Sequence, residues 1–546
     1  MDETVIAAAE HIMGVVFTGA ERRTMAGTLP AQIELTAMRR AFALPIDIEP
    51  ACRFDPRLPG FVMPPDLPVA DDQRIFDLPT DDIDIAFAPV AAQSAWIKSG
   101  QLSARRLTDI YLARMTAHNP ALCCYVTMLP EQARARADQL DRLLAGGTWL
   151  GPLHGIPYGC KDILDTAGIT TGWGAEPYRD RVPSADAAVV ARLNAAGAVL
   201  LGKTSVGALA YGDLWYGGRT RNPWNIEEGS SGSSAGSASA VGAGLAAFAI
   251  GTETLGSIVS PSTRCGTIGL RPTFGRVART GTMSLCPSLD KIGPICRDTT
   301  DCAMVLAAIN GADEHDVSSI AAPFEGAAAF DLRTLRVGYV PADFALDDAM
   351  PTDHAALAAM GELGVEMVAL ERPDLPYNAL ISILMAEAAA RFEELTLSDR
   401  DDELTWQGPE AWPNQFRQSR FLSAVDHIQL DRLRRVSMQM MDRLFAEVDM
   451  IIGPSLAGPM LVISNFTGHP CLCLPAGFIE TATRGPDTLE DISVPDAPGN
   501  GPAHRVPHSI TLLGRLFDEA RLLALGAALQ AALPVTARPA LFNQVP

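Results

Sequence analysis

The chain has 546 residues, 48% of them hydrophobic and 20% charged, and this composition excludes a globally disordered protein. Its 64 Asp and Glu exceed its 43 Lys and Arg, so the net charge of -21 repels polyanions and argues against a nucleic-acid partner. No apolar run reaches the length of a membrane span and the acidic start MDETV does not fit a secretory signal, so we expect no membrane contact and a cytoplasmic location.

The first part of the chain differs in character from the rest. Residues 1 to about 65 show a helical and then an extended pattern, and residues 55–72 form a connector rich in Pro and Asp. We place a boundary near residue 92, with an N-terminal, mostly helical extension at 1–92 and the main domain at 93–546. Amphipathic helices of the extension would either line a substrate entrance or form a homodimer contact, and the sequence does not choose between these alternatives.

Helix and strand signals follow in alternation. One amphipathic helix is predicted from the cap Ser103 to the stop signal Pro120, and a second from Pro130 to Gly146. A further helix is predicted at 186–197, and strands at 155–163, 198–202, 335–340, 365–370, 449–456 and 509–514. This alternation predicts an α/β domain with helices on both faces of a sheet.

Two other features concern loops and thiols. Residues 479–507 are Pro-rich and lack periodicity, which predicts a long functional or disordered loop. The ten cysteines are scattered through the chain, so we expect them to stay reduced. Cys471 and Cys473 would share one face of a strand as small buried side chains, because no second ligand pair completes a zinc site.

The stretch EGSSGSSAGSASAVGAGL at 228–245 has three simple interpretations. A flexible linker is disfavoured because an apolar segment that needs a core follows directly. A nucleotide loop at GAGLAA (242–247) lacks the strand that must precede it. A nucleophile elbow at GSSAG (232–236), centred on Ser234, also lacks its preceding apolar strand, but it stays open. Its histidine partner would be one of His427, His469, His504 and His508.

A fourth interpretation covers more of the chain. GPLHGIPYGCKDILDTAGITTGWG (151–174), AAGAVLLGKTS (195–205), the Ser-rich stretch and GTETLGSIVSPSTRCGTIGLRPTFGRV (251–277) occur in this order. Together they closely resemble the amidase signature family, serine hydrolases that use a Ser, cis-Ser and Lys triad. The resemblance is strong over 93–310 and weaker at 465–478 and 509–530. It implies the fold of that family, a large mixed sheet flanked by helices on both faces.

The resemblance also implies a role for each catalytic residue. Ser257 in TLGSI would be the nucleophile, Ser233 the bridging serine after a cis peptide bond, and Lys161 in GCKD the base. Ser233 and Ser257 are 24 positions apart, as the family pattern requires. The neighbouring serines would support them: Ser230, Ser231, Ser234 and Ser237. The oxyanion hole would consist of the backbone N–H groups of Thr254, Leu255, Gly256 and Ser257. Such a site needs no cofactor and no metal.

A lysine can act as a base at neutral pH only when it is uncharged, and desolvation lowers its pKa. Lys161 lies in the apolar segment GIPYGCKDIL, which predicts burial. We expect Asp162 to point away, because neighbouring side chains of a strand face opposite sides. The proton would pass from Ser257 through Ser233 to neutral Lys161 and then return to the leaving amine.

Near the nucleophile the sequence departs from the family pattern. Leu255 replaces a usual glycine, Glu253 a usual aspartate, and Val259 an arginine found in many members. Since valine cannot pair with a carboxylate, a small acidic substrate such as a malonamate-like monoamide is disfavoured. Arg264, where an aromatic residue is common, would supply either a charge for the substrate or a structural ion pair.

Three further positions concern the loops around the site. Ser231 stands where a second glycine is usual before the bridging serine. Asp290 and Arg297 match family positions that hold the catalytic loops in place, and we interpret both as structural.

We therefore expect an amide hydrolase that cleaves a non-peptide carbon–nitrogen bond of a small molecule through an acyl-serine intermediate. The substrate would be a primary amide, an anilide or a similar neutral amide, and an ester or carbamate is accessible to the same machinery. Three alternatives remain: an amidotransferase (transamidation) subunit, against which the net charge argues, a non-catalytic scaffold, and an elbow hydrolase that uses Ser234.

Overall fold

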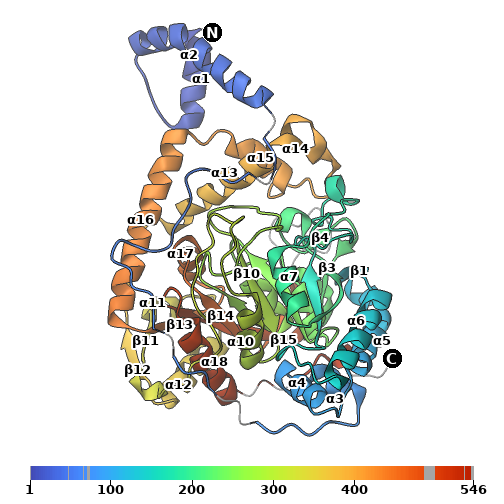
Figure 1. The fold of residues 1–546 in the computed structure, drawn as a ribbon. Coiled ribbons are helices and arrows are strands. Elements are labelled where there is room, and N and C mark those ends of the chain that lie inside the picture. Colours follow the sequence, from blue (N-terminus) through green and yellow to red (C-terminus); the bar gives the residue numbers. More distant parts are fainter. Residues whose placement is uncertain are drawn as a thin grey trace.

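The structure is a computed structural model that describes residues 2–42, 44–46, 48–65, 67–70, 74–484, 498–533, 535 and 537–542. An 11-stranded sheet crosses the molecule in the order β1-β3-β2-β8-β10-β9-β14-β15-β13-β11-β12 (Figure 1). Its strands are β1 (Tyr125–Met128), β2 (Pro157–Lys161), β3 (Val199–Thr204), β8 (Phe248–Glu253), β9 (Ile268–Arg271), β10 (Lys291–Cys296), β11 (Arg336–Tyr339), β12 (Glu366–Ala369), β13 (Met450–Pro454), β14 (Cys471–Arg484) and β15 (Pro498–Gly514).

The sheet contains both parallel and antiparallel pairs of strands. β2 pairs in parallel with β3 and β8, and β11 pairs in parallel with β12 and β13. The strands between these two groups pair antiparallel. The sheet is therefore mixed, and the fold class expected from the sequence is confirmed.

Helices cover both faces of the sheet. Leu472 of β14 contacts the side of α10 (Thr299–Ile309) and α18 (Glu519–Ala532), whereas Cys473 contacts α9 (Val259–Cys265) on the opposite side. α8 (Ala235–Gly242) packs beside α9. Both faces are apolar for this reason, and strands such as β2, β8 and β10 are buried along their whole length. The remaining helices near the body are α3 (Asp82–Phe87), α4 (Val90–Lys98), α5 (Ala104–Leu122), α6 (Pro130–Ala145), α7 (Ala188–Ala195), α11 (Pro341–Phe344), α12 (Pro351–Glu362), α13 (Ile381–Arg391), α14 (Glu393–Leu397), α15 (Trp412–Ser419), α16 (Ala424–Glu447) and α17 (Met460–Phe466).

The first predicted helix extends beyond its expected end. Ser103 caps α5 by accepting the N–H of Arg106, as expected, but the helix passes Pro120 and ends at Cys123 in the left-handed conformation with φ 49. Pro120 removes only one backbone hydrogen bond, and it does so in the last turn, so the helix can close after it. The helix predicted from Pro130 to Gly146 is confirmed as α6.

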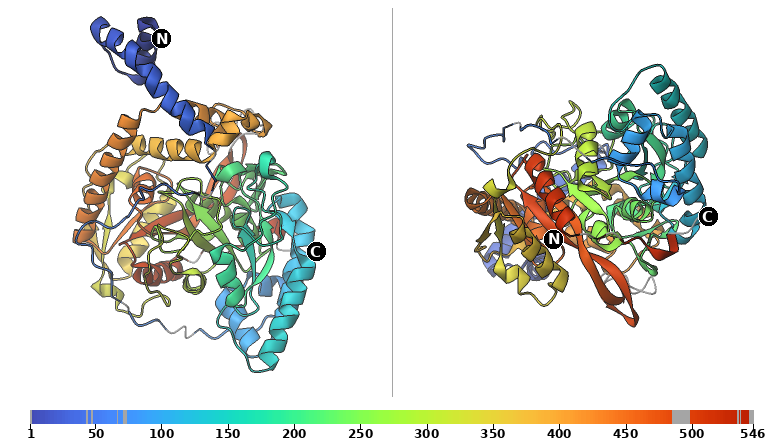
Figure 2. Two further views of the ribbon diagram at one scale, coloured as in Figure 1. Left: turned by 45° about the horizontal axis from the view of Figure 1, so that its top comes forward. Right: turned by 90° about the horizontal axis from the view of Figure 1, so that it is seen from below.

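The predicted loop at 479–507 is wrong for the residues that the structure describes. β14 and β15 continue through it as a long hairpin, with Ile479 opposite Val506 and Thr481 opposite His504. Figure 2 shows this hairpin extending from the body, and residues 485–497 of the predicted loop lie outside the described residues. The pairing partners are distant in sequence, and local composition does not reveal such pairs.

The N-terminal part contains α1 (Glu3–Met13) and α2 (Gly19–Ala41), which stand off the body (Figures 1 and 2). α2 has no buried residue, whereas α4 contributes Val90, Trp96 and Ile97 to the main hydrophobic core. The proposed boundary at residue 92 falls inside α4, and the division into 1–92 and 93–546 stays a prediction.

Two small antiparallel ribbons lie close to the functional region. They consist of β4 (Leu214–Trp215) with β5 (Gly218–Arg219), and β6 (Arg221–Asn222) with β7 (Asn225–Gly229). All ten cysteines are unpaired, as expected, and Cys471 and Cys473 are buried in one apolar cluster. Within the described ranges, no helix has the length and apolar character that crossing a membrane requires.

Candidate active site

Lys161 is the last residue of β2 and is fully buried. Its Nζ lies 2.8 Å from Ser233 Oγ, 3.0 Å from Ser234 Oγ and 2.8 Å from Thr252 Oγ1. Burial lowers the pKa of Lys161 well below its ordinary value, and the more distant carboxylates of the site oppose this effect only in part. The surroundings therefore favour the uncharged amine.

Asp162 faces away from this amine, as expected. Its Oδ2 accepts the N–H of Gly172 at 2.9 Å, and its charged neighbour is Lys203. Burial raises the pKa of Asp162 to about 7, despite the positive charge of Lys203. The aspartate next in sequence to Lys161 therefore does not form an ion pair with it.

The Ser-rich stretch is a buried turn between β7 and α8. The peptide bond between Gly232 and Ser233 is cis, and a side chain at residue 232 would collide with the backbone oxygen of Gly212 at 1.8 Å. Ser233 is 1% exposed, and the residues from Ser233 through α8 are buried, so the linker interpretation is wrong. Ser231 adopts the left-handed conformation with φ 59, donates its N–H to Asp213 and places its Oγ 2.6 Å from Ser260 Oγ.

Ser234 does not have the exposure that a nucleophile elbow requires. Its side chain is fully buried at the start of α8, and its Oγ lies near Lys161 Nζ and donates to the carbonyl oxygen of Thr252 at 3.0 Å. The same Oγ accepts the N–H of Thr252 at 3.1 Å. The hydroxyl is thus occupied by β2 and β8, and none of its hydrogen-bond partners is a histidine.

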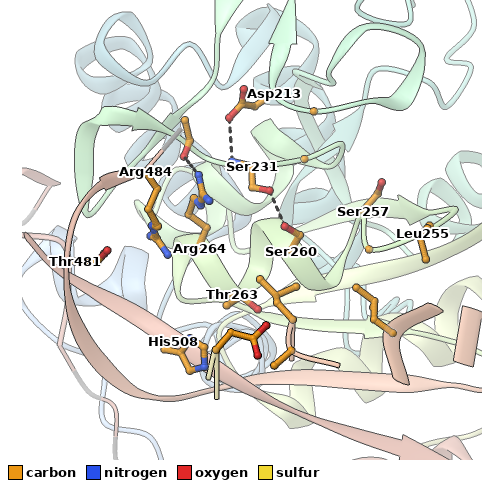
Figure 3. Close-up of a pocket in the computed structure, with 18 of the residues that line it drawn as sticks. Asp213, Ser231, Leu255, Ser257, Ser260, Thr263, Arg264, Thr481, Arg484 and His508 are labelled. Carbon is orange, nitrogen blue, oxygen red and sulfur yellow. Dashed lines mark hydrogen bonds between the residues drawn. The ribbon is translucent and has the colours of Figure 1, made fainter. Parts of the chain in front are cut away.

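Ser257 lies in the turn between β8 and α9 and lines a cavity of about 580 Å³. Its carbonyl oxygen accepts the N–H of Ser234 at 3.1 Å, which ties the turn to the Ser-rich stretch. Its hydroxyl has no hydrogen-bond partner among the described residues and is available to a ligand in the cavity (Figure 3).

The backbone of this turn suits an oxyanion hole. Gly256 has φ 81, a conformation that residues with a Cβ rarely adopt, and this reverses the chain direction within one residue. The N–H groups of Leu255, Gly256 and Ser257 have no acceptor in the described part of the chain. The hydroxyl of Thr254, the fourth residue expected here, donates to Asp290 at 2.6 Å, and its backbone N–H stays a predicted member of the oxyanion hole.

Glu253 holds the turn that contains Ser257 through hydrogen bonds to the residues that follow it. Its Oε2 accepts the N–H groups of Ile258 at 2.8 Å and Val259 at 3.0 Å, which are the first residues after Ser257. Its Oε1 accepts from Arg271 at 2.7 Å and from Asn465 at 2.9 Å. The buried carboxylate of Glu253 therefore joins the start of α9 to β9, which carries Arg271, and to α17, which carries Asn465.

Asp290 and Arg297 both have structural roles, but only Asp290 contacts the catalytic turn, through Thr254. Asp290 Oδ2 accepts the N–H groups of Leu285 at 2.7 Å and Cys286 at 2.9 Å, while its Oδ1 holds Thr254. Arg297 donates to the carbonyl oxygens of five residues: Ala86, Phe87, Ala88, Val241 and Ala246. Asp290 holds a loop, whereas Arg297 joins the C-terminal ends of α3 and α8, and neither side chain lines the cavity beside Ser257.

Several contributors to the site were not predicted. Thr252 precedes Glu253 on β8 and points toward Lys161, and strand alternation from Glu253 could have indicated this. Glu228 and Arg484 form a buried ion pair of 2.8 Å at the cavity, but they are 256 positions apart and no local pattern links them. In the described residues, no group of three or more His, Cys, Asp or Glu could hold a metal ion.

Known proteins resemble this chain over most of its length. A family model described as Amidase matches residues 106–523. A glutamyl-tRNA(Gln) amidotransferase subunit of Roseiflexus castenholzii is 35% identical over 471 residues, which cover 81% of this chain and 95% of that protein.

Solved structures show the same similarity. The native peptide amidase from Stenotrophomonas maltophilia matches with a TM-score of 0.69 and 27% identity, covering 84% of this chain and 99% of its own. A chain of a vestigial protein complex, described as revealing the evolutionary origins of an s-triazine catabolic enzyme, matches with a TM-score of 0.71 and 28% identity, covering 81% of this chain and 98% of its own. The motifs around Lys161, Ser233 and Ser257 thus occur in a chain that belongs to the amidase signature family.

Proposed function

We propose that the protein is an amide hydrolase that cleaves a non-peptide carbon–nitrogen bond through an acyl intermediate on Ser257. The observation that carries this proposal is the buried contact of 2.8 Å between Lys161 Nζ and Ser233 Oγ, next to a turn that exposes Ser257 to the cavity. A desolvated amine and a bridging hydroxyl form a general base for a serine that has no histidine partner.

In the proposed reaction, Ser233 and Lys161 first take up the proton of Ser257 and then return a proton to the leaving group. Ser257 Oγ attacks the amide carbon as its proton moves to Ser233 and the Ser233 proton moves to Lys161. The N–H groups of Thr254, Leu255, Gly256 and Ser257 would donate to the oxygen that becomes negative. Protonated Lys161 then returns a proton through Ser233 to the leaving nitrogen, and water hydrolyses the acyl-Ser257 ester by the same relay.

An active-site probe tests this proposal. A fluorophosphonate should label wild-type protein at Ser257, and Ser257→Ala should abolish the label. Lys161→Ala should slow labelling by a factor of about 100 to 10,000, the usual contribution of a positioned base. Ser237→Ala is a matched control, because the Ser237 hydroxyl in the same stretch bonds to Ile250 O and Thr204 Oγ1 and is not a hydrogen-bond partner of Lys161.

The outcome of labelling also separates the alternatives. A label on Ser234 would support the elbow hydrolase, and no label on the wild-type chain would support a non-catalytic scaffold. Turnover rates of amides, anilides, esters and carbamates, measured on the unlabelled enzyme, would then rank the leaving groups.

A second candidate is a transamidation subunit, which the similarity to a glutamyl-tRNA(Gln) amidotransferase subunit favours. Such a protein would release ammonia from an amide donor and pass it to a partner protein. The net charge of -21 disfavours direct contact with a nucleic acid but does not disfavour a protein partner. Turnover of a simple amide by the purified chain alone would support the hydrolase, whereas turnover only after a partner protein is added would support this second function.

A further inference from the structure

His508 is a polar side chain of the cavity that the proposed reaction does not use. It lies on β15, lines the cavity beside Ser257 and is only 8% exposed. Its Nε2 lies 3.2 Å and 3.3 Å from the two carboxylate oxygens of Asp353. Its Nδ1 has no hydrogen-bond partner in the described part of the chain. One nitrogen of the imidazole is thus held by the protein, and the other is left for a ligand of the cavity.

The register of the β14–β15 hairpin explains the contact between His508 and Asp353. His508 stands opposite Gly477, just after a bulge that follows Pro475. A Cβ atom at Gly477 would lie 2.7 Å from Thr352 Cγ2, so the glycine lets the first turn of α12 approach the strand. Asp353 follows Thr352 in this turn and therefore reaches His508.

Asp353 is a fixed hydrogen-bond acceptor. It is fully buried, and its Oδ2 also accepts the N–H of Met350 at 2.8 Å. It is the third residue of α12, where the helix dipole favours a negative charge. An ionised carboxylate only accepts hydrogen bonds, so the hydrogen between the two side chains belongs to Nε2 of His508. In the neutral imidazole, Nδ1 is then an acceptor.

We propose that Nδ1 of His508 accepts a hydrogen bond from the substrate, so that the substrate is an amide with an uncharged hydrogen-bond donor, a hydroxyl or N–H group, remote from its scissile carbon. The inference rests on the proposed function of Ser257. A ligand without such a donor would displace water from Nδ1 and leave this acceptor unpaired, which disfavours that ligand. His508 is therefore a specificity-determining residue, and it is not a hydrogen-bond partner of Lys161 or Ser233.

The dimensions of the cavity set the position of this donor in the substrate. Figure 3 shows His508 on the β14–β15 side of the cavity, with Thr263 between it and Ser257. The cavity has a volume of about 580 Å³, which accommodates a molecule of moderate size. Leu456 and Leu461 also line it and suit an apolar spacer. Several carbon atoms therefore separate the amide from the donor.

A purely structural role of the His508–Asp353 pair makes a different prediction. The pair joins β15 to the first turn of α12, and this link needs only the contact of Nε2. If the pair were only structural, loss of Nδ1 alone would leave ligand selectivity unchanged. Recognition through Nδ1 instead predicts a change in binding that depends on whether the ligand carries a donor.

Protection of Ser257 from the fluorophosphonate probe tests this inference. 6-Hydroxyhexanamide and heptanamide have equal lengths and differ in a terminal hydroxyl, whereas 6-methoxyhexanamide and octanamide form a pair whose oxygen can only accept. Shorter and longer homologues of both pairs vary the spacer. At about pH 8.5, above the range in which histidines ordinarily change charge, we expect wild-type protein to be protected by the hydroxyl compound at a lower concentration than by its hydrocarbon partner. The methoxy group should give no such gain.

Two variants and one control locate the effect. His508→Gln keeps a side-chain N–H for Asp353 and removes the acceptor at Nδ1, so the preference for the hydroxyl should fall by about tenfold. Asp353→Asn can donate an N–H to Nε2 while its oxygen still accepts from Met350, which moves the imidazole hydrogen to Nδ1. This variant should favour the methoxy compound over octanamide. His504→Gln is the matched control, because His504 lies on the same strand and does not line the cavity.

The outcomes distinguish the two proposals. The role of His508 is overturned if wild-type protein shows no preference for the hydroxyl at any spacer length, if it prefers the methoxy group, or if His508→Gln leaves the preference unchanged. In each of these cases a labelled Ser257 still supports the hydrolase. Should Asp353→Asn fail to fold, the comparison of wild type with His508→Gln decides. Wild-type protein that is not labelled at Ser257 overturns the proposed function, and the substrate inference falls with it.

Discussion

Lys161 and Lys203 are both fully buried lysines on adjacent strands, but their neighbours differ. Lys203 Nζ donates to Leu164 O, Thr166 Oγ1 and Thr171 Oγ1, and the carboxylate of Asp162 is near it. Lys161 instead faces three hydroxyl groups and one carbonyl oxygen. A buried amine with neutral neighbours loses its proton most easily, so Lys161 is the lysine suited to act as a base.

The pH dependence of acylation follows from this difference. Because burial lowers the pKa of Lys161, a larger fraction of this amine is neutral at a given pH than for an ordinary lysine, and that fraction falls as the pH drops through the pKa of Lys161. We expect the rate of fluorophosphonate labelling at Ser257 to be constant at high pH and to fall about tenfold per pH unit below the lysine pKa. Labelling rates measured between about pH 5 and 9 would show whether the rate falls in this way as the pH is lowered.

Two observations would contradict this prediction. One is a rate that rises only near the pKa of an ordinary lysine, about 10.4. The other is an equally steep limb in Lys161→Ala. Circular dichroism across the same range would show that the wild-type chain stays folded where its rate falls.

At the scale of elements, the link between β8 and α9 depends on one carboxylate. Burial alone would raise the pKa of Glu253, but Arg271 and Lys291, together with the N–H of Val259, lower it to about 2. The carboxylate is therefore charged at every pH at which the protein is assayed. It fixes the first turn of α9 and, through it, the position of Ser257.

Glu253→Gln should disrupt this link. The change leaves Arg271 without its charged partner in a buried site, and losing one member of a buried pair costs about 3 to 5 kcal/mol. Urea unfolding would measure the decrease in the free energy of unfolding. A lower rate of fluorophosphonate labelling at Ser257 would show that the turn between β8 and α9 has moved. Glu253→Asp keeps the charge and should recover part of both quantities, because only the reach of the side chain changes. A Gln variant with normal stability and normal labelling would contradict this role.

At the scale of the whole molecule, α1 and α2 are nearly independent of the body. In these helices only Ile6 and Glu10 are buried, and Arg39 of α2 contacts Glu393 at 2.6 Å. Apolar side chains of α2 are exposed, such as Ile33 at 50% and Met38 at 64%. Contact with the substrate entrance and a homodimer contact both stay predictions for this segment.

Removal of residues 1–41 separates these two predictions. We expect the Ser257 labelling rate and the melting temperature to stay close to those of the full chain, since little apolar surface is buried against the body. Sedimentation of both forms would show a change in mass if the helices hold a dimer. A tenfold loss of labelling would instead place the segment at the substrate entrance.

The amino-acid sequence by itself determined the local features of this protein. Ser103 and Pro130 set the starts of α5 and α6, and the motifs around Lys161 and Ser257 identified the family, because caps and motifs depend on neighbouring residues. Tertiary structure alone decided the β14–β15 hairpin, the Glu228–Arg484 pair and the support of the Ser257 turn by Asn465 and Arg271. These contacts join residues far apart in the chain, and only the packing of helices on a mixed sheet brings them within hydrogen-bonding distance.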